Sequence, residues 1–83
     1  MKYPRIWIAA HGGPVKAALK PEATPEVLEI VAVIGSNDDA RWAVAIHPNT
    51  PTAVLRWLIA NFPSEIYVCG GARDNLRKRG LKE

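Results

Sequence analysis

The sequence predicts an all-α fold in which about two helical repeats, with partial units at both ends, form one domain over residues 1–83. The first observation is an internal repeat, because residues 20–46 and 47–73 align at a step of 27 residues. The pairs that coincide at this step include Pro21 with Pro48, Val27 with Val54 and Leu28 with Leu55. The second observation is the helical spacing of apolar residues in each unit. The third is a set of seven prolines, which keeps the helices short.

The clearest helix is expected over residues 25–34. Thr24 supplies an N-cap hydroxyl, and Pro25 fits the first helical position because no N–H is needed there. Apolar residues then recur at the i, i+3, i+4, i+7 spacing of one buried face, namely Val27, Ile30, Val31 and Ile34. Gly35 is expected to end this helix.

A second, shorter helix is expected over residues 40–46, after a turn and cap at residues 36–39. One of its faces carries Trp42, Ala45 and Ile46. Trp42 is therefore assigned to the core, which a tryptophan fills well in a small protein. His47 is expected to close the helix, and Pro48 prevents its extension.

The next helix is expected over residues 51–62, where Thr50 and Pro51 repeat the arrangement of cap and first helical position. Its inner face is expected to consist of Leu55, Leu58, Ile59 and Phe62. Pro63 then ends the regular part of the second unit.

The two ends of the chain are less regular. Residues 11–14, His-Gly-Gly-Pro, are typical of a turn that redirects the chain. Residues 66–69 are expected to form a short element, which the glycine pair at 70–71 weakens. A separate charged helix over residues 73–79 is expected to belong to a basic C-terminal cap, residues 73–83, that covers the last hydrophobic layer.

An α+β fold is the alternative. Three segments rich in β-branched and aromatic residues are short enough to be strands, namely residues 5–10, 41–46 and 65–70. The second and third occupy equivalent places in the two units, so they should share a structure. The alanines of 41–46 favour a helix there, and the helical fold is therefore preferred.

Residues 38–61, DDARWAVAIHPNTPTAVLRWLIAN, resemble a unit of the variant leucine-rich repeat (LRV) family. The positions that match its pattern are Arg41, Ala43, Val44, Ala45, Pro48, Thr50, Pro51, Val54, Leu55 and Leu58. The resemblance covers about residues 15–62, whereas residues 1–14 and 66–83 match poorly. It implies α-helices alternating with short 3₁₀ helices in a right-handed superhelix, and it implies no catalytic residue. The iron–sulfur cysteine cluster of one founding member is not carried over, because this chain has one cysteine.

The net charge of +3 lies entirely in the last eleven residues. Residues 1–72 hold six Lys or Arg and six Asp or Glu, whereas residues 73–83 hold five and two. Cys69 is the only cysteine, so no disulfide forms within the chain and a reducing cytoplasm fits best. The N-terminal residues show no secretory pattern, and no apolar run is long enough to predict a membrane span.

His11, His47 and Cys69 are the residues that suggest chemistry. Neither C-x-x-C nor H-x-x-x-H spacing occurs, so we predict no metal site and no cofactor. A small enzyme using His47 and Cys69 is a minor alternative, because no residue is clearly placed to orient such a pair. The preferred interpretation is non-catalytic, with His47 at a helix end and Cys69 buried.

The residues predicted to bind a partner are aromatic or basic. Trp57 is expected to be half-exposed beside Arg56, and Trp7 lies near one end of the stack. The basic candidates are Arg73, Arg77, Lys78 and Arg79.

The leading functional hypothesis is a cytoplasmic helical-repeat module that binds another protein, because stacked repeats present an extended surface. A homodimer is a further hypothesis, since two repeats leave hydrophobic ends uncovered. The alternative is nucleic-acid binding through the basic C-terminal segment, where charge would contact phosphates. No aromatic residues interleave with those charges, so base stacking is not expected.

Overall fold

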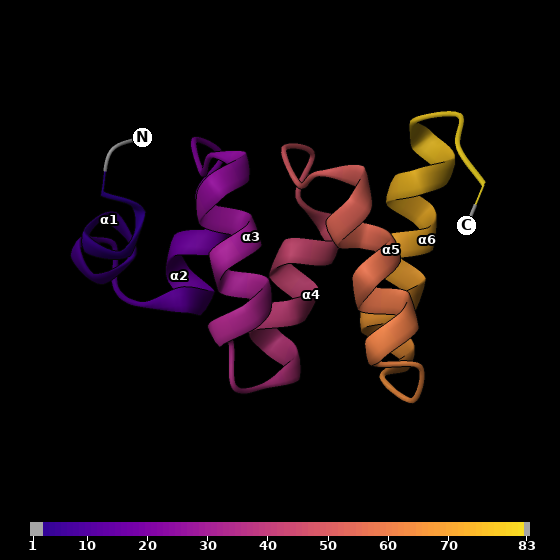
Figure 1. The fold of residues 1–83 in the computed structure, drawn as a ribbon, viewed down its shortest axis with the longest axis horizontal. Coiled ribbons are helices and arrows are strands. Elements are labelled where there is room, and N and C mark those ends of the chain that lie inside the picture. Colours follow the sequence, from indigo (N-terminus) through magenta and orange to yellow (C-terminus); the bar gives the residue numbers. More distant parts are fainter. Residues whose placement is uncertain (1–2, 83) are drawn as a thin grey trace.

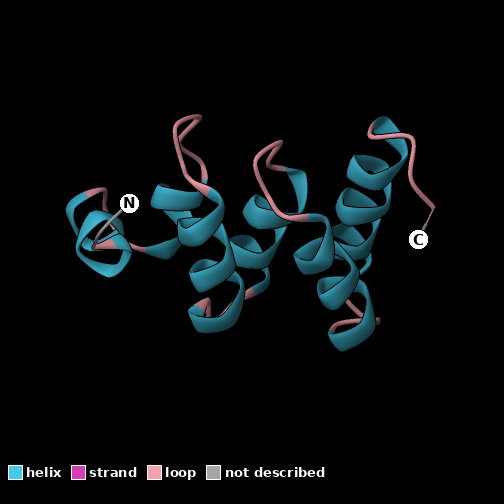
Figure 2. Cartoon of the chain, turned by 45° about the horizontal axis from the view of Figure 1, so that its top comes forward, coloured by secondary structure: helices cyan, strands magenta, loops and turns pink. Residues whose placement is uncertain are grey.

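The computed structural model describes residues 3–82 and contains six α-helices. They are α1 (Pro4–Ala10), α2 (Pro14–Ala18), α3 (Pro25–Ile34), α4 (Asp38–Ile46), α5 (Thr52–Asn61) and α6 (Ile66–Lys78). No β-strand occurs within residues 3–82 (Figure 2), so the all-α prediction is confirmed. The α+β alternative is wrong: apart from Glu65, the segments 5–10, 41–46 and 65–70 lie in α1, α4 and α6. Packing of a helical face overrides their β propensity.

The helices form two rows. α3 contacts α1 and α5 in one row, and α4 contacts α2 and, most extensively, α6 in the other. Figure 1 shows the pairs α1–α2, α3–α4 and α5–α6 following one another along the longest dimension, with α3 in front of α2 and α5 in front of α6. The extents are 33 × 24 × 16 Å. Among the helices of the described part, none is both long and apolar enough to cross a membrane.

The step of 27 residues seen in the sequence also relates two helices. α3 covers Pro25–Ile34 and α5 covers Thr52–Asn61, so both the first and the last residues differ by that step. The loops that precede these helices lie along one edge of the molecule (Figure 2).

These loops are joined to one another by side-chain hydrogen bonds. Asn49 Nδ2, in the loop between α4 and α5, donates to the Ala23 carbonyl in the loop between α2 and α3 at 2.9 Å. One unit later, the Arg79 guanidinium, just after α6, donates to the Pro48 carbonyl at 3.0 Å. The connections therefore stack along with the helices.

The predicted start of α3 is confirmed, whereas α4 begins at Asp38, two residues before the predicted start and within the segment expected to form a turn and cap. The Thr24 hydroxyl accepts the Val27 N–H at 3.3 Å, and the Asn37 side-chain oxygen accepts the Ala40 N–H at 3.0 Å. Each satisfies a backbone donor that has no partner within its helix. Hydrogen bonds from its own backbone N–H and then from the Thr24 hydroxyl lower the pKa of Glu26 below its usual value.

The prediction that Thr50 caps the following helix is wrong. α5 begins at Thr52, after Pro51, and no side chain hydrogen-bonds to its first turn. The Thr50 hydroxyl is buried and donates to the Val44 carbonyl at 2.6 Å. A buried hydroxyl needs a hydrogen-bond partner. The Thr50 hydroxyl finds this partner in the Val44 carbonyl, in the last turn of α4.

The prediction of a short element followed by a separate charged helix is also wrong, because α6 runs unbroken through the glycine pair at 70–71. Its buried residues are Val68, Cys69, Ala72, Asn75 and Leu76. Burial of this face against α4 and α5 offsets the cost of about 1 kcal/mol that each helical glycine carries. Packing explains Gly71, since a Cβ there would lie 3.1 Å from Cγ2 of Ile46, whereas a Cβ on Gly70 would meet nothing within 4 Å.

The core consists of aliphatic side chains from both rows. The largest fully buried ones are Leu28, Leu55, Leu58, Leu76, Val27, Val31, Val44 and Val68. The assignment of Trp42 to the core is wrong, because 41% of this residue is exposed. α4 buries small residues instead, namely Ala40, Ala43, Val44 and Ala45, and these allow the neighbouring helices to approach closely. Ile34, expected on the buried face of α3, is likewise exposed.

The turn predicted at residues 11–14 is confirmed between α1 and α2. Gly12 and Gly13 have φ angles of +93° and +97°. These angles lie in the left-handed region, which glycine enters without a steric penalty.

Candidate functional site: the face formed by α4 and α6

His47 and Cys69, the residues of the minor enzymatic alternative, are both buried and both contact the backbone. Nε2 of His47 lies 2.8 Å from the Lys20 carbonyl oxygen, and its Nδ1 accepts the Asn49 N–H at 3.0 Å. Because a carbonyl only accepts and an N–H only donates, the ring carries a proton on Nε2 and a lone pair on Nδ1. Through its contact with the Lys20 carbonyl, His47 joins two successive units of the stack. Cys69 Sγ lies 3.1 Å from the Phe62 carbonyl oxygen.

His11 and Trp7 form a separate contact in the first helix pair. His11 Nδ1 lies 2.8 Å from the Trp7 carbonyl oxygen, and the two rings stack with their centroids 3.9 Å apart. Trp7 is half-buried against the core, at the end of the molecule opposite α6 (Figure 1). Within residues 3–82, no three His, Cys, Asp or Glu side chains are grouped as metal ligands.

Arg79, one of the predicted binding residues, is committed to contacts within the chain. Its guanidinium donates to the Asn75 side-chain oxygen and the Thr52 hydroxyl, each at 3.2 Å, as well as to the Pro48 carbonyl. These three acceptors lie in α6, in α5 and in the loop before α5. Arg79 therefore connects the end of α6 to α5 and to the loop before α5.

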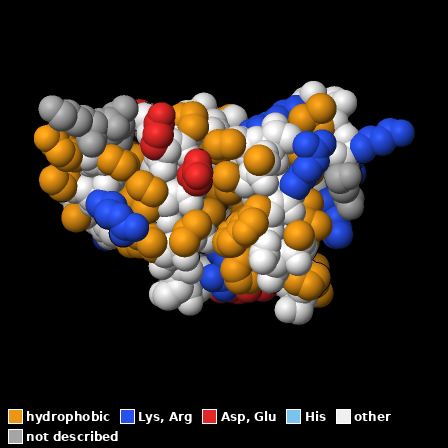
Figure 3. All heavy atoms as spheres, viewed as in Figure 1, with side chains coloured by type: hydrophobic (Ala, Val, Ile, Leu, Met, Phe, Trp, Pro, Cys, Tyr) orange, Lys and Arg blue, Asp and Glu red, His pale blue; other side chains and the backbone are white. Residues whose placement is uncertain are grey.

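The remaining basic candidates lie on α6, and Figure 3 shows several Lys and Arg side chains at that end of the molecule. Arg77 and Lys78 are exposed in the last turn of α6, and Arg73 is half-buried one turn earlier. Lys78 Nζ pairs with an Asp74 carboxylate oxygen at 3.2 Å, and both side chains are exposed. An exposed ion pair of this kind contributes little to stability. Arg77 and Lys78 both remain in contact with solvent.

Trp57 and Arg56 lie on α5, in the other row. Trp57 is 38% exposed, as expected, and meets the Phe62 ring edge to face with the centroids 5.7 Å apart. Arg56 donates to the Lys82 carbonyl at 3.0 Å. The structure therefore does not bring the predicted binding residues into one site, because they divide among α1, α5 and the end of α6.

The structure instead gathers exposed apolar side chains that the sequence analysis did not select. Trp42 and Ile46 lie one turn apart on α4, and Ile66 and Tyr67 begin α6. The exposed fractions of the four residues are 41%, 42%, 79% and 82%. Together with the glycine pair at 70–71, they form what we call the α4–α6 face.

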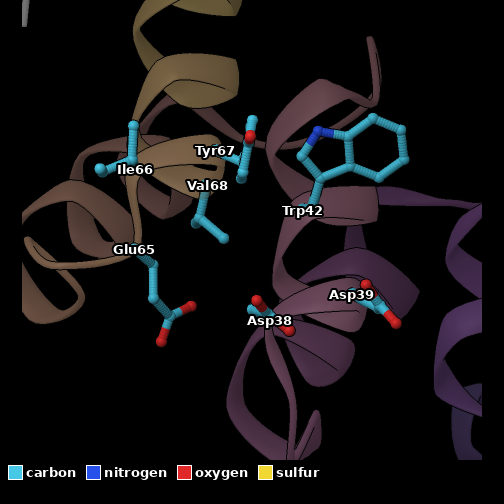
Figure 4. Close-up of a pocket in the computed structure, with 7 residues that line it drawn as sticks. All are labelled: Asp38, Asp39, Trp42, Glu65, Ile66, Tyr67 and Val68. Carbon is cyan, nitrogen blue, oxygen red and sulfur yellow. The ribbon is translucent and has the colours of Figure 1, made fainter.

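Two hollows follow the line along which α4 and α6 meet. The first, of about 320 Å³, is lined by Asp38, Asp39, Trp42, Glu65, Ile66, Tyr67 and Val68 (Figure 4). The second, of about 410 Å³, is lined by Ile46, Pro48, Gly71, Asp74, Asn75, Lys78 and Arg79. In Figure 4 the side chains from the start of α4 lie across the first hollow from those of α6, and the Tyr67 ring projects toward α4.

Arg41 fixes the start of α4 to the start of α6. Its Nε and one terminal nitrogen donate to the two carboxylate oxygens of Glu65 at 2.8 and 2.9 Å. The other terminal nitrogen donates to the Gly35 carbonyl at 3.1 Å, and the guanidinium carbon lies 4.2 Å from the centroid of the Phe62 ring. Only 13% of the Arg41 side chain and 23% of the Glu65 side chain are exposed, so water screens this pair less than a surface pair.

Asn75 fixes the other end of the same two helices. Its Nδ2 donates to the Ala45 carbonyl at 3.0 Å and to the His47 carbonyl at 2.9 Å, while its Oδ1 accepts from Arg79. The Ala45 carbonyl, which lacks a donor within α4, is thereby satisfied by α6, and the His47 carbonyl, which accepts the Thr50 N–H at 3.2 Å, gains a second donor. With Arg41 at the start and Asn75 at the end, α4 and α6 run in the same direction and are joined at both ends.

The charges on this surface are separated along the two helices. The acidic residues Asp38 and Asp39 lie in the first turn of α4. The basic residues Arg77 and Lys78 lie in the last turn of α6. The face therefore has an apolar middle, an acidic end at the start of α4, and an end at α6 that stays net basic although Asp74 pairs with Lys78.

No family model, no curated protein and no solved structure matches the chain.

Proposed function

We propose that the chain is a non-catalytic helical-repeat module, similar to the variant leucine-rich repeats, that binds another protein through the α4–α6 face. The observation that carries the proposal is the exposure of four large apolar side chains on two adjacent helices, with Ile66 and Tyr67 at 79% and 82%. A contiguous apolar patch with a polar rim is typical of an interaction surface. Tyrosine and tryptophan are the residues most often found as binding anchors.

The joined ends of α4 and α6 support the same proposal. Arg41 and Asn75 hold the helices at fixed separation, so the surface exists before a partner arrives. A preformed surface loses less conformational entropy on binding, and more of the contact energy then appears as affinity.

The contacts and burial of His47 and Cys69 support a non-catalytic role. Both ring nitrogens of His47 contact the backbone, and Cys69 is buried. The stacked loops and the repeated helix positions support a superhelix of repeats, in which each unit contacts its neighbours. The short 3₁₀ helices that the resemblance implies do not occur within residues 3–82, because α2, α4 and α6 are α-helices. A free thiol such as Cys69 fits the reducing cytoplasm, where we place the protein.

Hydroxyl-radical footprinting compares the two faces within one molecule. Trp42 on α4 and Trp57 on α5 have nearly equal exposure, 41% and 38%, so they should oxidise at similar rates in dilute purified protein. In cells that make the protein, a bound partner should slow Trp42 oxidation severalfold relative to Trp57, as mass spectrometry of the two peptides would measure. Equal rates in cells, or selective protection of Trp57, would contradict the assignment of the binding face.

A further inference from the structure

We infer that the α4–α6 face binds a second copy of this chain, antiparallel and related by a two-fold axis that passes close to Gly70. This inference rests on the proposed function, because it names the partner of the same face. In a two-fold interface, residue i contacts residue j of the partner, and residue j contacts residue i in return. The face must therefore be complementary to itself after a rotation of 180°.

The charges satisfy this condition. Asp38 and Asp39 lie at one end of the face, and Arg77 and Lys78 lie at the other. Because α4 and α6 run in the same direction, a rotation of 180° about the middle of the face exchanges the two ends. The acidic end of each protomer then lies opposite the basic end of its partner, which gives two favourable contacts per dimer.

Lys78 is paired with Asp74 within one protomer, whereas Arg77, Asp38 and Asp39 form no ion pair within residues 3–82 and remain for a partner. Tyr67 and Lys78 are separated by eleven residues of α6, a rise of about 16 Å. This length exceeds the screening distance of about 8 Å at physiological ionic strength. The two ends therefore act on their surroundings as separate charges, and a second copy can compensate both at once.

The middle of the face is suited to a close crossing of two helices. Gly70 is exposed in the middle of α6, and a Cβ there would meet nothing within 4 Å. A glycine costs stability in a helix interior, and no contact within the chain requires this one. It allows the backbone of another helix to approach, with Tyr67 of each protomer packing beside the crossing point.

The size of the face predicts a weak dimer. α6 contributes a length of about 20 Å, and two adjacent helices with their side chains a width of about 20 Å, so each protomer would bury on the order of 400 Å². Stable complexes bury about 800 Å² per partner, whereas weak and transient ones bury less. Assembly is therefore expected to be weak and to depend on protein concentration.

The test is sedimentation equilibrium of the full chain up to about 1 mM, which detects association with a dissociation constant in the millimolar range or below. Two double variants reverse the charges: Asp38→Lys with Asp39→Lys, and Arg77→Glu with Lys78→Glu. Each variant alone would place like charges together at both contacts and should dimerise at least tenfold more weakly than wild type. An equimolar mixture should restore the association, because both contacts become attractive again in the heterodimer. Restoration also shows that both variants are folded.

A second pair of variants keeps the test independent of the charged residues. Tyr67→Lys places a charge on the apolar part of the face, three residues before Gly70, and should abolish the dimer, whereas Val33→Lys, at a 69% exposed position on α3, should leave it unchanged. A wild-type chain that stays monomeric at about 1 mM, a mixture that does not associate, or equal effects of the two lysine variants would overturn the inference. A monomer whose Trp42 is still protected in cells would leave the proposed function standing with a different protein as partner.

Discussion

Asn75→Ala is expected to lower the free energy of unfolding by about 2–3 kcal/mol, because a buried acceptor without a partner costs about 1–3 kcal/mol. Only 8% of Asn75 is exposed, and its amide donates to the carbonyls of Ala45 and His47. Alanine leaves the Ala45 carbonyl without a donor, removes one of the two donors to the His47 carbonyl, and removes the acceptor for Arg79. Urea unfolding followed by circular dichroism would measure the change from the shifted midpoint.

Asn61→Ala is the matched control. Asn61 is exposed at the end of α5, and its amide donates only to the Trp57 carbonyl one turn earlier in the same helix. This variant is expected to change stability by at most about 0.5 kcal/mol. Equal losses for the two variants would mean that Asn75 does not carry the connection between α4 and α6.

Arg41→Ala is expected to destabilise the protein by about 2–3 kcal/mol. The substitution leaves the largely buried Glu65 carboxylate without its paired donor and removes the contact of the guanidinium with Phe62. Arg41→Lys should recover only a small part of the loss, because an ammonium cannot donate two parallel hydrogen bonds to a carboxylate and a third to the Gly35 carbonyl. Thermal unfolding of both variants beside wild type would measure this order.

Arg5→Ala provides the comparison for loss of an arginine from the surface. Arg5 is exposed on α1, and its removal should change the free energy of unfolding by less than about 0.5 kcal/mol. If Arg41→Lys were as stable as wild type, charge alone would account for the contact. The proposed fixation of the starts of α4 and α6 by the guanidinium geometry would then be wrong.

The helix pattern could be predicted from the sequence wherever local signals act alone. Thr24 caps α3 as expected, and Asn37, within the cap predicted at residues 36–39, caps α4, because a cap is formed by residues three apart in the chain. Thr50 carries the same local signal as Thr24, yet its hydroxyl is buried and bonds to Val44. Which of two available partners a hydroxyl takes is decided by burial, and burial depends on the tertiary structure.

The continuity of α6 could not be predicted for a similar reason. The glycine pair at 70–71 weakens a helix in isolation, but packing against α4 and α5 stabilises α6 as a whole. Gly71 is the residue that permits this packing, because its missing side chain leaves room for Ile46. The local signal that argues against the helix is therefore the feature that allows its tertiary contact.

The candidate site was missed because it depends on how two distant segments pair. Trp42 and Ile46 show a helical spacing, but the spacing does not tell which side of α4 faces the core. The small side chains of α4 take the buried side, which turns Trp42 outward. The exposed face of residues 66–78 becomes apparent only when these residues are treated as one continuous helix.

Photo-crosslinking in cells tests the central claim, that the α4–α6 face binds protein, most directly. A photoreactive phenylalanine would replace Tyr67, which is 82% exposed on the α4–α6 face, or Val33, which is 69% exposed on α3 in the other row. Irradiation is predicted to join position 67 to a polypeptide, either a second copy of this chain or another protein, while position 33 gives no comparable product. Adducts from position 33 in equal yield, or adducts from position 67 with nucleic acid instead of protein, would contradict the claim.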